Sequence, residues 1–161
     1  MSASEEWLSS YIRGGYAVYI PASSIVLTKE EIDYIAEKEK IPKQKASKLY
    51  NITLAQLEKQ AIQEEQKNPG SKNNIASRIL RHLWWMARYG GEPKLAQHLK
   101  RIKITQPPTC TYKGTPTKCP KNAPIEGLAY AIQRACFKAG KQLEKQGIRN
   151  HQLCRISYPK G

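Results

Sequence analysis

The segment that most constrains this fold is residues 72–89, which read KNNIASRILRHLWWMARY. With about 3.6 residues per helical turn, its apolar side chains share one face of an α-helix: Ile75, Ile79, Leu83, Met86 and Ala87. A second face collects four residues about one turn apart: Arg78, Arg81, Trp85 and Arg88. Gly90 and Gly91 end the segment. The pattern predicts a helix with one buried face and one cationic face.

Start and stop signals divide most of the remaining chain into helices. Thr28 with Glu31, and Thr53 with Gln56, have the spacing of a capping box. Ser71 is placed to cap the helix of residues 72–89, and prolines open the last two helices. The expected helices span about residues 2–12, 28–39, 43–50, 53–67, 72–89, 93–104 and 124–146.

The other segments predict little regular structure. Residues 16–27 are apolar and rich in β-forming residues but contain Pro21, which indicates an extended arm or a weak edge strand. Residues 105–123 are rich in proline and are expected to form an irregular loop. We therefore predict an all-α fold with an N-terminal arm (1–27), helix-turn-helix-like helices (28–68), and a basic helical bundle with a tail (71–161).

Charge is distributed very unevenly along the chain. The net charge is +14, yet residues 1–70 hold nine Lys and Arg against ten Asp and Glu, whereas residues 71–161 hold 18 against three. Helices with so few carboxylates repel one another unless an anionic partner neutralises them. Nucleic acid is the commonest polyanionic partner, so the C-terminal part is the expected nucleic-acid-binding region.

The cations of this region gather on three segments. The first is the row of residues 78–88 described above, in which guanidinium groups one turn apart suit successive phosphates. Trp85 in that row is expected to stack on a base or sugar, or else to cover a contact between helices. The last helix carries Arg134, Lys138, Lys141 and Lys145 beside an apolar stripe of Leu128, Ile132, Ala135, Cys136, Ala139 and Leu143. Between the two helices lie Lys94, Lys100, Arg101 and Lys103.

The four cysteines do not have the spacing of a zinc site, so no metal is expected. Cys110 and Cys119 flank the turn-forming stretch TYKGTPTK, which would allow a disulfide-closed loop. Two reduced thiols beside a loop are the alternative. Proteins of hyperthermophiles and of assembled particles keep such bonds more often than ordinary cytosolic proteins.

Catalytic patterns are weak in this sequence. His82, His98 and His151 have no evident partners at ligand or triad spacing. After residue 70 the acidic residues are Glu92, Glu126 and Glu144, which are too few and too scattered to hold Mg²⁺ for a nuclease. We expect a non-enzymatic protein without a cofactor or a small-molecule substrate.

The segment KASKLYNITLAQLEKQ (45–60) resembles the Pipsqueak-type and transposase-type helix-turn-helix. The matching positions are Ala46, Leu49, Tyr50, Asn51, Ile52 and Leu57, and TKEEIDYIAEKE would be the first helix. The resemblance implies two helices packed across a tight turn. The expected reading positions include Leu54 and Ala55, and among them Gln56 is the one suited to a base edge. Phosphate contact is therefore expected instead, through Lys43, Lys45 and Lys48.

A second resemblance lies in the overall organisation, in which an arm and a helix-turn-helix precede a basic helical part. This organisation looks like that of the DNA-wrapping coat proteins of filamentous and rod-shaped viruses of hyperthermophilic archaea. The likeness implies a coat subunit that wraps double-stranded DNA in a helical nucleoprotein filament through phosphate contacts. Four aromatic residues of the arm would bind neighbouring subunits: Trp7, Tyr11, Tyr16 and Tyr19.

Two alternatives remain open: a helix-turn-helix transcription regulator, and a subunit of an RNA or protein complex. No apolar run approaches the roughly 20 residues that span a bilayer, so no transmembrane segment is expected. Glu5 and Glu6 stand where a signal peptide would be basic. We expect a protein made in the cytoplasm and, as a coat subunit, found in the virion.

Overall fold

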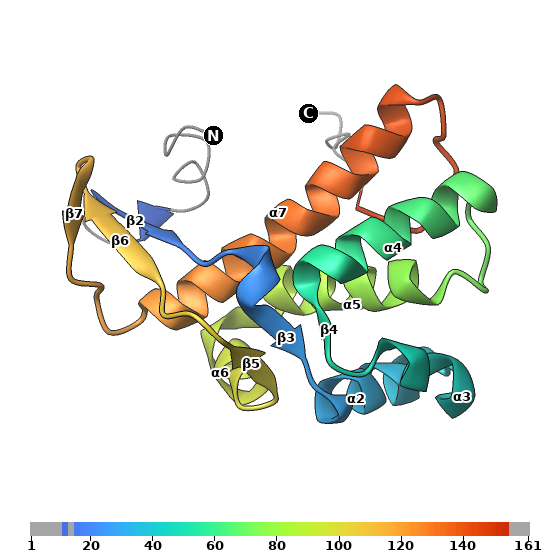
Figure 1. Ribbon diagram of the computed structural model, residues 1–161, viewed down its shortest axis with the longest axis horizontal. Helices are drawn as coiled ribbons and strands as arrows, with labels where there is room; N and C mark the ends of the chain where they lie inside the picture. Colours follow the sequence, from blue (N-terminus) through green and yellow to red (C-terminus); the bar gives the residue numbers. More distant parts are fainter. Residues whose placement is uncertain (1–10, 13–14, 155–161) are drawn as a thin grey trace.

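The protein has a mixed α/β fold, so the predicted all-α class is wrong. The computed structural model describes residues 11–12 and 15–154 (Figure 1). Seven strands of two to four residues form two antiparallel sheets in this part of the chain, and strands this short carry too few residues to show an alternation in the sequence. The helices are α2 (Lys29–Glu39), α3 (Lys43–Ala46), α4 (Leu54–Lys67), α5 (Ile75–Tyr89), α6 (Gly91–Leu99) and α7 (Ala123–Lys145), with 3-10 turns η2 (Ala22–Ser24) and η3 (Ser47–Leu49).

Three helices form the centre of the core, because α4, α5 and α7 each pack against the other two. The predicted apolar face of α5 is buried, as is the predicted stripe of α7. Here the helical periodicity of the sequence correctly predicted which side chains face the core. The long helices α5 and α7 leave their cationic residues on the outside of this core, where they are described below.

The segment that resembles a helix-turn-helix does form two short helical pieces, a tight turn and a longer helix. Asn51 in the turn has φ 62°, a left-handed conformation that asparagine tolerates. Ala46, Leu49 and Leu57 are buried between the helices. α4 begins at the predicted capping box, in which Thr53 and Gln56 exchange hydrogen bonds of 3.1 and 3.0 Å.

The start of α5 differs from the prediction, because its N-cap is Asn74 and not Ser71. The side chain of Asn74 donates to Glu65 Oε2 and to the carbonyl oxygen of Asn68, each at 2.8 Å. Glu65 is fully buried and also accepts the backbone N–H of Gly70 at 2.8 Å. These hydrogen bonds hold residues 68–74 in a loop, so α5 begins three residues later than the sequence predicted.

A three-stranded sheet of order β4-β3-β5 lies beside the helices (β3, Ile25–Leu27; β4, Ile52–Thr53; β5, Ile102–Ile104). The helix predicted over residues 93–104 is therefore wrong at its end, since α6 stops at Leu99. Ile102 is buried and Lys103 is exposed, which is the alternation of a strand. Pairing with β3 decided the conformation of these residues.

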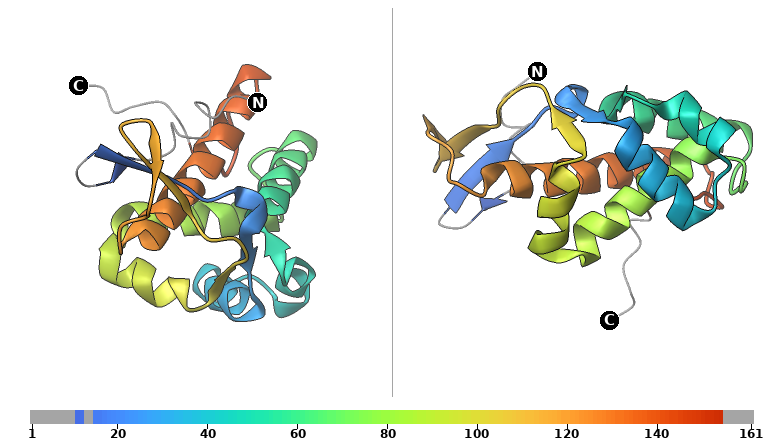
Figure 2. Two further views of the ribbon diagram at one scale, coloured as in Figure 1. Left: turned by 60° about the vertical axis from the view of Figure 1, so that its left-hand side comes forward. Right: turned by 90° about the horizontal axis from the view of Figure 1, so that it is seen from below.

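A four-stranded sheet of order β1-β2-β6-β7 lies at one end of the molecule, away from α3 (Figures 1 and 2). Residues 105–123, expected to be irregular, supply its hairpin of β6 (Thr109–Tyr112) and β7 (Thr115–Thr117). Lys113 and Gly114 both have positive φ, as a two-residue type I′ turn requires. The other strands come from the predicted arm: β1 (Tyr11–Ile12), in the region expected to be helical, and the inner strand β2 (Tyr16–Tyr19).

Two disulfides each join a helix or strand to the irregular segment that follows it or its hairpin. Cys110 on β6 is bonded to Cys119, which closes the loop that the sequence allowed. Cys136 on α7 is bonded to Cys154, a pairing that no spacing in the sequence indicated. The second bond folds residues 146–154 back along α7.

Candidate nucleic-acid interface

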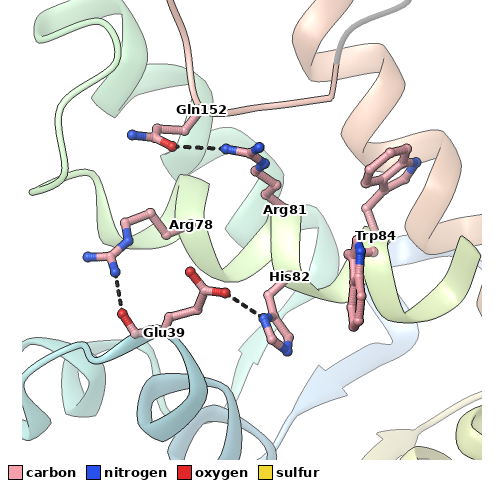
Figure 3. A pocket seen from close by; sticks show the side chains of 7 residues that line it. Glu39, Arg78, Arg81, His82, Trp84 and Gln152 are labelled. Carbon is pink, nitrogen blue, oxygen red and sulfur yellow. Dashed lines mark hydrogen bonds and ion pairs between the residues drawn. The ribbon is translucent and has the colours of Figure 1, made fainter. Parts of the chain in front are cut away.

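A hollow of about 450 Å³ lies beside α5, between the end of α2 and the residues that follow α7 (Figure 3). Its size is within the range of about 300–1,000 Å³ that is typical of small-ligand sites. Seven residues line this α5 hollow: Glu39, Arg78, Arg81, His82, Trp84, Trp85 and Gln152. The predicted row Arg78, Arg81 and Trp85 therefore reaches one concave site, whereas Arg88 lies further along the helix.

Arg78 is held in place by backbone oxygens. Its guanidinium donates to the carbonyl oxygen of Lys72 at 3.0 Å. It also donates to the carbonyl oxygen of Glu39 (Figure 3). Because Glu39 is the last residue of α2, the guanidinium supplies a positive charge to the C-terminal end of that helix, where the helix dipole favours cations. Arg78 thus joins three segments while it lines the hollow.

His82 lies against Glu39 in the same hollow. Its Nδ1 is 2.7 Å from Glu39 Oε2, and the imidazole is more deeply buried than the carboxylate. Glu39 is the one carboxylate among the described residues that line the hollow, and the guanidinium groups of Arg78 and Arg81 line it as well. The site therefore keeps an excess of positive charge.

The C-terminal segment completes the wall through Gln152. Its side-chain oxygen accepts from Arg81 at 3.3 Å (Figure 3). Its amide nitrogen donates to the carbonyl oxygen of Gly70 at 3.0 Å. The Cys136–Cys154 disulfide holds this segment, and a Cβ at Gly140 would lie 1.8 Å from the carbonyl oxygen of Cys154. Only glycine at position 140 permits so close an approach to α7.

Aromatic rings continue the site along the outside of α5. The side chain of Trp85 is 49% exposed and that of Tyr89 is 61% exposed. The Trp85 ring centre lies 6.1 Å from that of His82 and 6.2 Å from that of Tyr89. The guanidinium of Arg88 lies 5.6 Å above the ring of Tyr89. We call this surface the α5 platform and define it as Arg81, His82, Trp85, Arg88 and Tyr89.

The neighbouring Trp84 has a different environment. Its ring packs edge-on against Phe137 of α7, with ring centres 5.9 Å apart. Its indole N–H is buried and finds no acceptor among the described residues. Trp84, and not Trp85, therefore covers the contact between α5 and α7, and the ring of Trp85 is exposed.

The cations between the two long helices divide into two groups. Lys94, Lys100 and Lys103 are exposed. Arg101 instead points inward, because its Nε donates to the fully buried Glu31 at 2.8 Å and its guanidinium lies 4.5 Å from the ring of Tyr34. Arg101 therefore has a structural contact that the sequence did not indicate.

The predicted row on α7 lies outside the α5 hollow. All four of its cations are exposed, but Lys138 is 3.4 Å from Glu58 on α4. Burial raises the pKa of the Glu58 carboxyl, while Lys138 and Arg134 oppose that rise. Arg134 and Lys138 line a hollow that shares no residue with the α5 hollow. The structure thus presents two cationic surfaces and not a single groove.

The exposed face of α4 differs from the one expected. Leu54 is fully buried, so it does not occupy a reading position. A shallow hollow is lined instead by polar residues of the turn and of α4, together with Ile52: Lys48, Tyr50, Asn51, Gln56, Lys59, Gln60 and Gln63. The core spacing of Leu54, Leu57 and Ala61 could have identified this face. Lys43, Lys45 and Lys48 are exposed as expected, and Lys45 Nζ lies 3.4 Å from Asn73.

The aromatic residues expected to bind neighbouring subunits have varied positions. Tyr16 is half-buried on β2, and its ring centre lies 4.9 Å from that of Tyr112. Tyr19 is also half-buried on β2 and lines the hollow beside Arg134. Tyr11 belongs to β1, and Trp7 lies outside the described residues. Tyr16 and Tyr19 thus take part in packing within the chain.

Each of the three histidines lies beside a glutamate, which sequence spacing did not show: His82 beside Glu39, His98 beside Glu31, and His151 beside Glu144. The partners are far apart in the sequence or on different elements, so only folding brings them together. Across residues 11–12 and 15–154, no group of three His, Cys, Asp or Glu side chains could hold a metal ion.

Neither a protein-family model, nor a curated protein, nor a solved structure matches this chain. Among the helices of the described residues, none has both the length and the apolar composition needed to cross a membrane. The case for a function therefore comes from the geometry and charge of the surfaces described above.

Proposed function

We propose that this chain is a non-enzymatic nucleic-acid-binding protein that holds double-stranded DNA through contacts with phosphates. The observation that supports this proposal best is the α5 platform, where Arg81 and Arg88 lie beside two exposed aromatic rings on one helix. Guanidinium groups bind phosphate oxygens in a bidentate manner, which makes arginine well suited to a nucleic-acid backbone.

The charge of the surrounding surface supports the same proposal. Residues 71–161 contain 18 Lys and Arg against three Asp and Glu, and Lys94, Lys100 and Lys103 extend the exposed cations beyond α5. Repulsion among these groups costs free energy in the isolated protein, and a polyanion relieves it. An acidic protein surface would also supply negative charge, but it lacks the regular spacing of phosphates along a helix groove.

Salt dependence tests this proposal directly. The affinity for a DNA duplex should fall between about 50 and 200 mM salt, with a slope of log K against log salt near −0.9 for each phosphate contacted. An Arg81→Gln/Arg88→Gln variant should reduce that slope by about 2. The control is Lys29→Gln, which removes an exposed cation from α2 and should leave the slope unchanged. A binding isotherm that does not respond to salt would reject the proposal.

The finer form of the proposal is a major coat subunit of a helical nucleoprotein filament of an archaeal virus. The two separate cationic surfaces are compatible with this role, because a subunit in such a filament contacts DNA over an extended path. Electron microscopy of purified protein mixed with linear duplex DNA is the test. Regular filaments of constant diameter are expected, and isolated particles along bare DNA would argue against a coat.

A second candidate is a helix-turn-helix regulator that reads DNA sequence with α4. The observation that favours it is the polar face of α4, where Gln56, Gln60 and Gln63 project beside Asn51. Glutamine and asparagine amides form paired hydrogen bonds with adenine in the major groove. Selection from a random DNA library decides between the candidates, because a reader enriches a short consensus and a phosphate binder does not.

A further inference from the structure

We propose that the α5 hollow binds one unpaired nucleobase, which stacks on Trp85 while its adjoining phosphate is bound by Arg81. This inference rests on the proposed nucleic-acid binding and adds the kind of nucleic acid that this site selects: a strand or a distorted duplex with an unpaired base. Three properties of the hollow support it, namely its size, its aromatic wall and its polar groups.

The size of the hollow suits a single ring system. About 450 Å³ accommodates a small ligand but not the stacked end of a duplex. The bases of an intact duplex present their edges in the grooves, while their faces are covered by the neighbouring base pairs. A base face therefore reaches this hollow only if the base is unpaired or turned out of the stack.

The aromatic wall has the exposure that stacking requires. Trp85 is 49% exposed, and its ring lines the hollow. His82 and Tyr89 lie 6.1 and 6.2 Å from it, which limits the side-chain positions that the indole can adopt. Stacking on an aromatic ring is tolerant of sequence because every base has a π face. The indole ring therefore has a restricted position before any base binds, and its face is accessible to a base.

The polar groups of the hollow suit the rest of a nucleotide. Arg81 is exposed, and among the described residues its guanidinium makes one hydrogen bond, of 3.3 Å to Gln152, which leaves donors for a phosphate. The carboxylate of Glu39 and the amide of Gln152 also line the hollow. A carboxylate that accepts one hydrogen bond from His82 keeps further lone pairs for the amino group of a base.

The test compares three labelled DNA probes of equal length: a perfect duplex, the same duplex with one extrahelical nucleotide, and a single strand. Fluorescence anisotropy gives the affinity of the protein for each. The wild-type protein should prefer the second and third probes, and Trp85→Ala should weaken binding to them by about 5- to 150-fold. Affinity for the perfect duplex should fall much less, because no base face reaches Trp85 in an intact duplex. Trp85→Phe, which keeps a ring, should retain most of the preference.

Controls separate this inference from the proposed function. Tyr112→Ala removes another exposed aromatic ring, on β6, and should leave all three affinities unchanged. Equal wild-type affinity for the three probes, with normal salt dependence, would reject the unpaired-base site and leave the proposed function standing. A Trp85→Ala variant that alters self-association in sedimentation, with unchanged probe binding, would also reject it. Failure to bind any probe would reject both proposals.

Discussion

At the scale of single residues, the buried carboxylate of Glu31 joins segments that are far apart in the sequence. It is fully buried on α2, and its two oxygens lie 2.8 Å from His98 Nδ1 and from Arg101 Nε. The contact links α2 to the region where α6 ends and β5 begins. The ion pairs with these partners offset part of the cost of burying the carboxylate, whose Oε2 accepts no hydrogen bond within the described residues.

Removing Glu31 should therefore be strongly destabilising. We expect Glu31→Ala to lower the free energy of unfolding by about 3–5 kcal/mol, because Arg101 and His98 would be left without their partner. Urea denaturation followed by circular dichroism measures this. Lys29→Ala is the control, since it breaks an exposed ion pair with Asp33, which contributes little to stability. Losses of equal size in the two variants would contradict the role of Glu31.

Glu58 provides a test of pH dependence. Burial raises its pKa above the ordinary value of 4.5, so the folded protein binds a proton more readily than the unfolded chain. The stability contributed by protonated Glu58 is present below the ordinary pKa and is lost as pH rises through the folded pKa. Glu58→Gln should therefore be more stable than wild type at neutral pH, and this advantage should disappear below about pH 4.5.

Thermal unfolding at several pH values measures this difference. Lys138→Gln is the informative control, because Lys138 opposes the rise in the pKa of Glu58. Removing Lys138 should raise the pKa of Glu58 further. Ionised Glu58 should then destabilise the folded protein more at neutral pH than it does in the wild type. If Glu58→Gln were less stable than wild type at neutral pH, the ion pair with Lys138 would outweigh the cost of burial.

At the scale of elements, the segment after α7 matters most for the candidate site. Residues 146–154 reach back along α7 and place Gln152 against Arg81, and the Cys136–Cys154 disulfide holds them there. A disulfide that closes a loop of this length constrains the unfolded chain and so stabilises the folded one. The wall of the α5 hollow therefore depends on a covalent bond to a different helix.

The two disulfides should differ in their effect on binding. Replacing Cys136 and Cys154 with Ala should lower the free energy of unfolding by about 3 kcal/mol and weaken binding to the unpaired-base probes. The matched control replaces Cys110 and Cys119 with Ala, which should cost about 2–3 kcal/mol and leave binding unchanged. Denaturation and anisotropy on the same preparations measure both effects. Equal effects on binding would contradict the role of the C-terminal segment.

At the scale of the whole molecule, the net charge of +14 governs the response to salt. Cations on α5, on α7 and between them repel one another across the surface, and few carboxylates compensate. The Debye length falls from about 30 Å at 0.01 M to about 8 Å at 0.15 M, so added salt screens this repulsion. Salt should therefore have opposite effects on folding and on binding.

We expect the unfolding midpoint of the free protein to be about 2–4 °C higher at 0.15 M than at 0.01 M salt. This shift corresponds to an increase of about 1 kcal/mol in the free energy of unfolding. Over the same range, affinity for DNA should fall. Calorimetry in a buffer without multivalent anions measures the first effect, because sulfate or phosphate would bind the cations directly. A midpoint that falls with salt would show that close ion pairs outweigh the long-range repulsion.

The helical faces of the candidate site were predictable, but its shape was not. The period of residues 75–89 fixed which side of α5 is buried and placed Arg81, Trp85 and Arg88 together on the other side. The residues outside α5 that line the α5 hollow belong to distant parts of the chain: Glu39 ends α2, and Gln152 follows α7. Contacts between residues 39 to 71 positions apart leave no local pattern in a single sequence.

The sequence by itself determined the long helices, their buried faces and the segregation of charge, because each depends on residues within a few turns of one another. Tertiary structure decided the two sheets, whose short strands gain their stability from partners such as β3 beside β5. It also decided which cations are free, since Arg101 turned inward to Glu31 while Arg81 stayed at the surface. Burial and pairing, which depend on the whole fold, separate a structural arginine from one that can bind a phosphate.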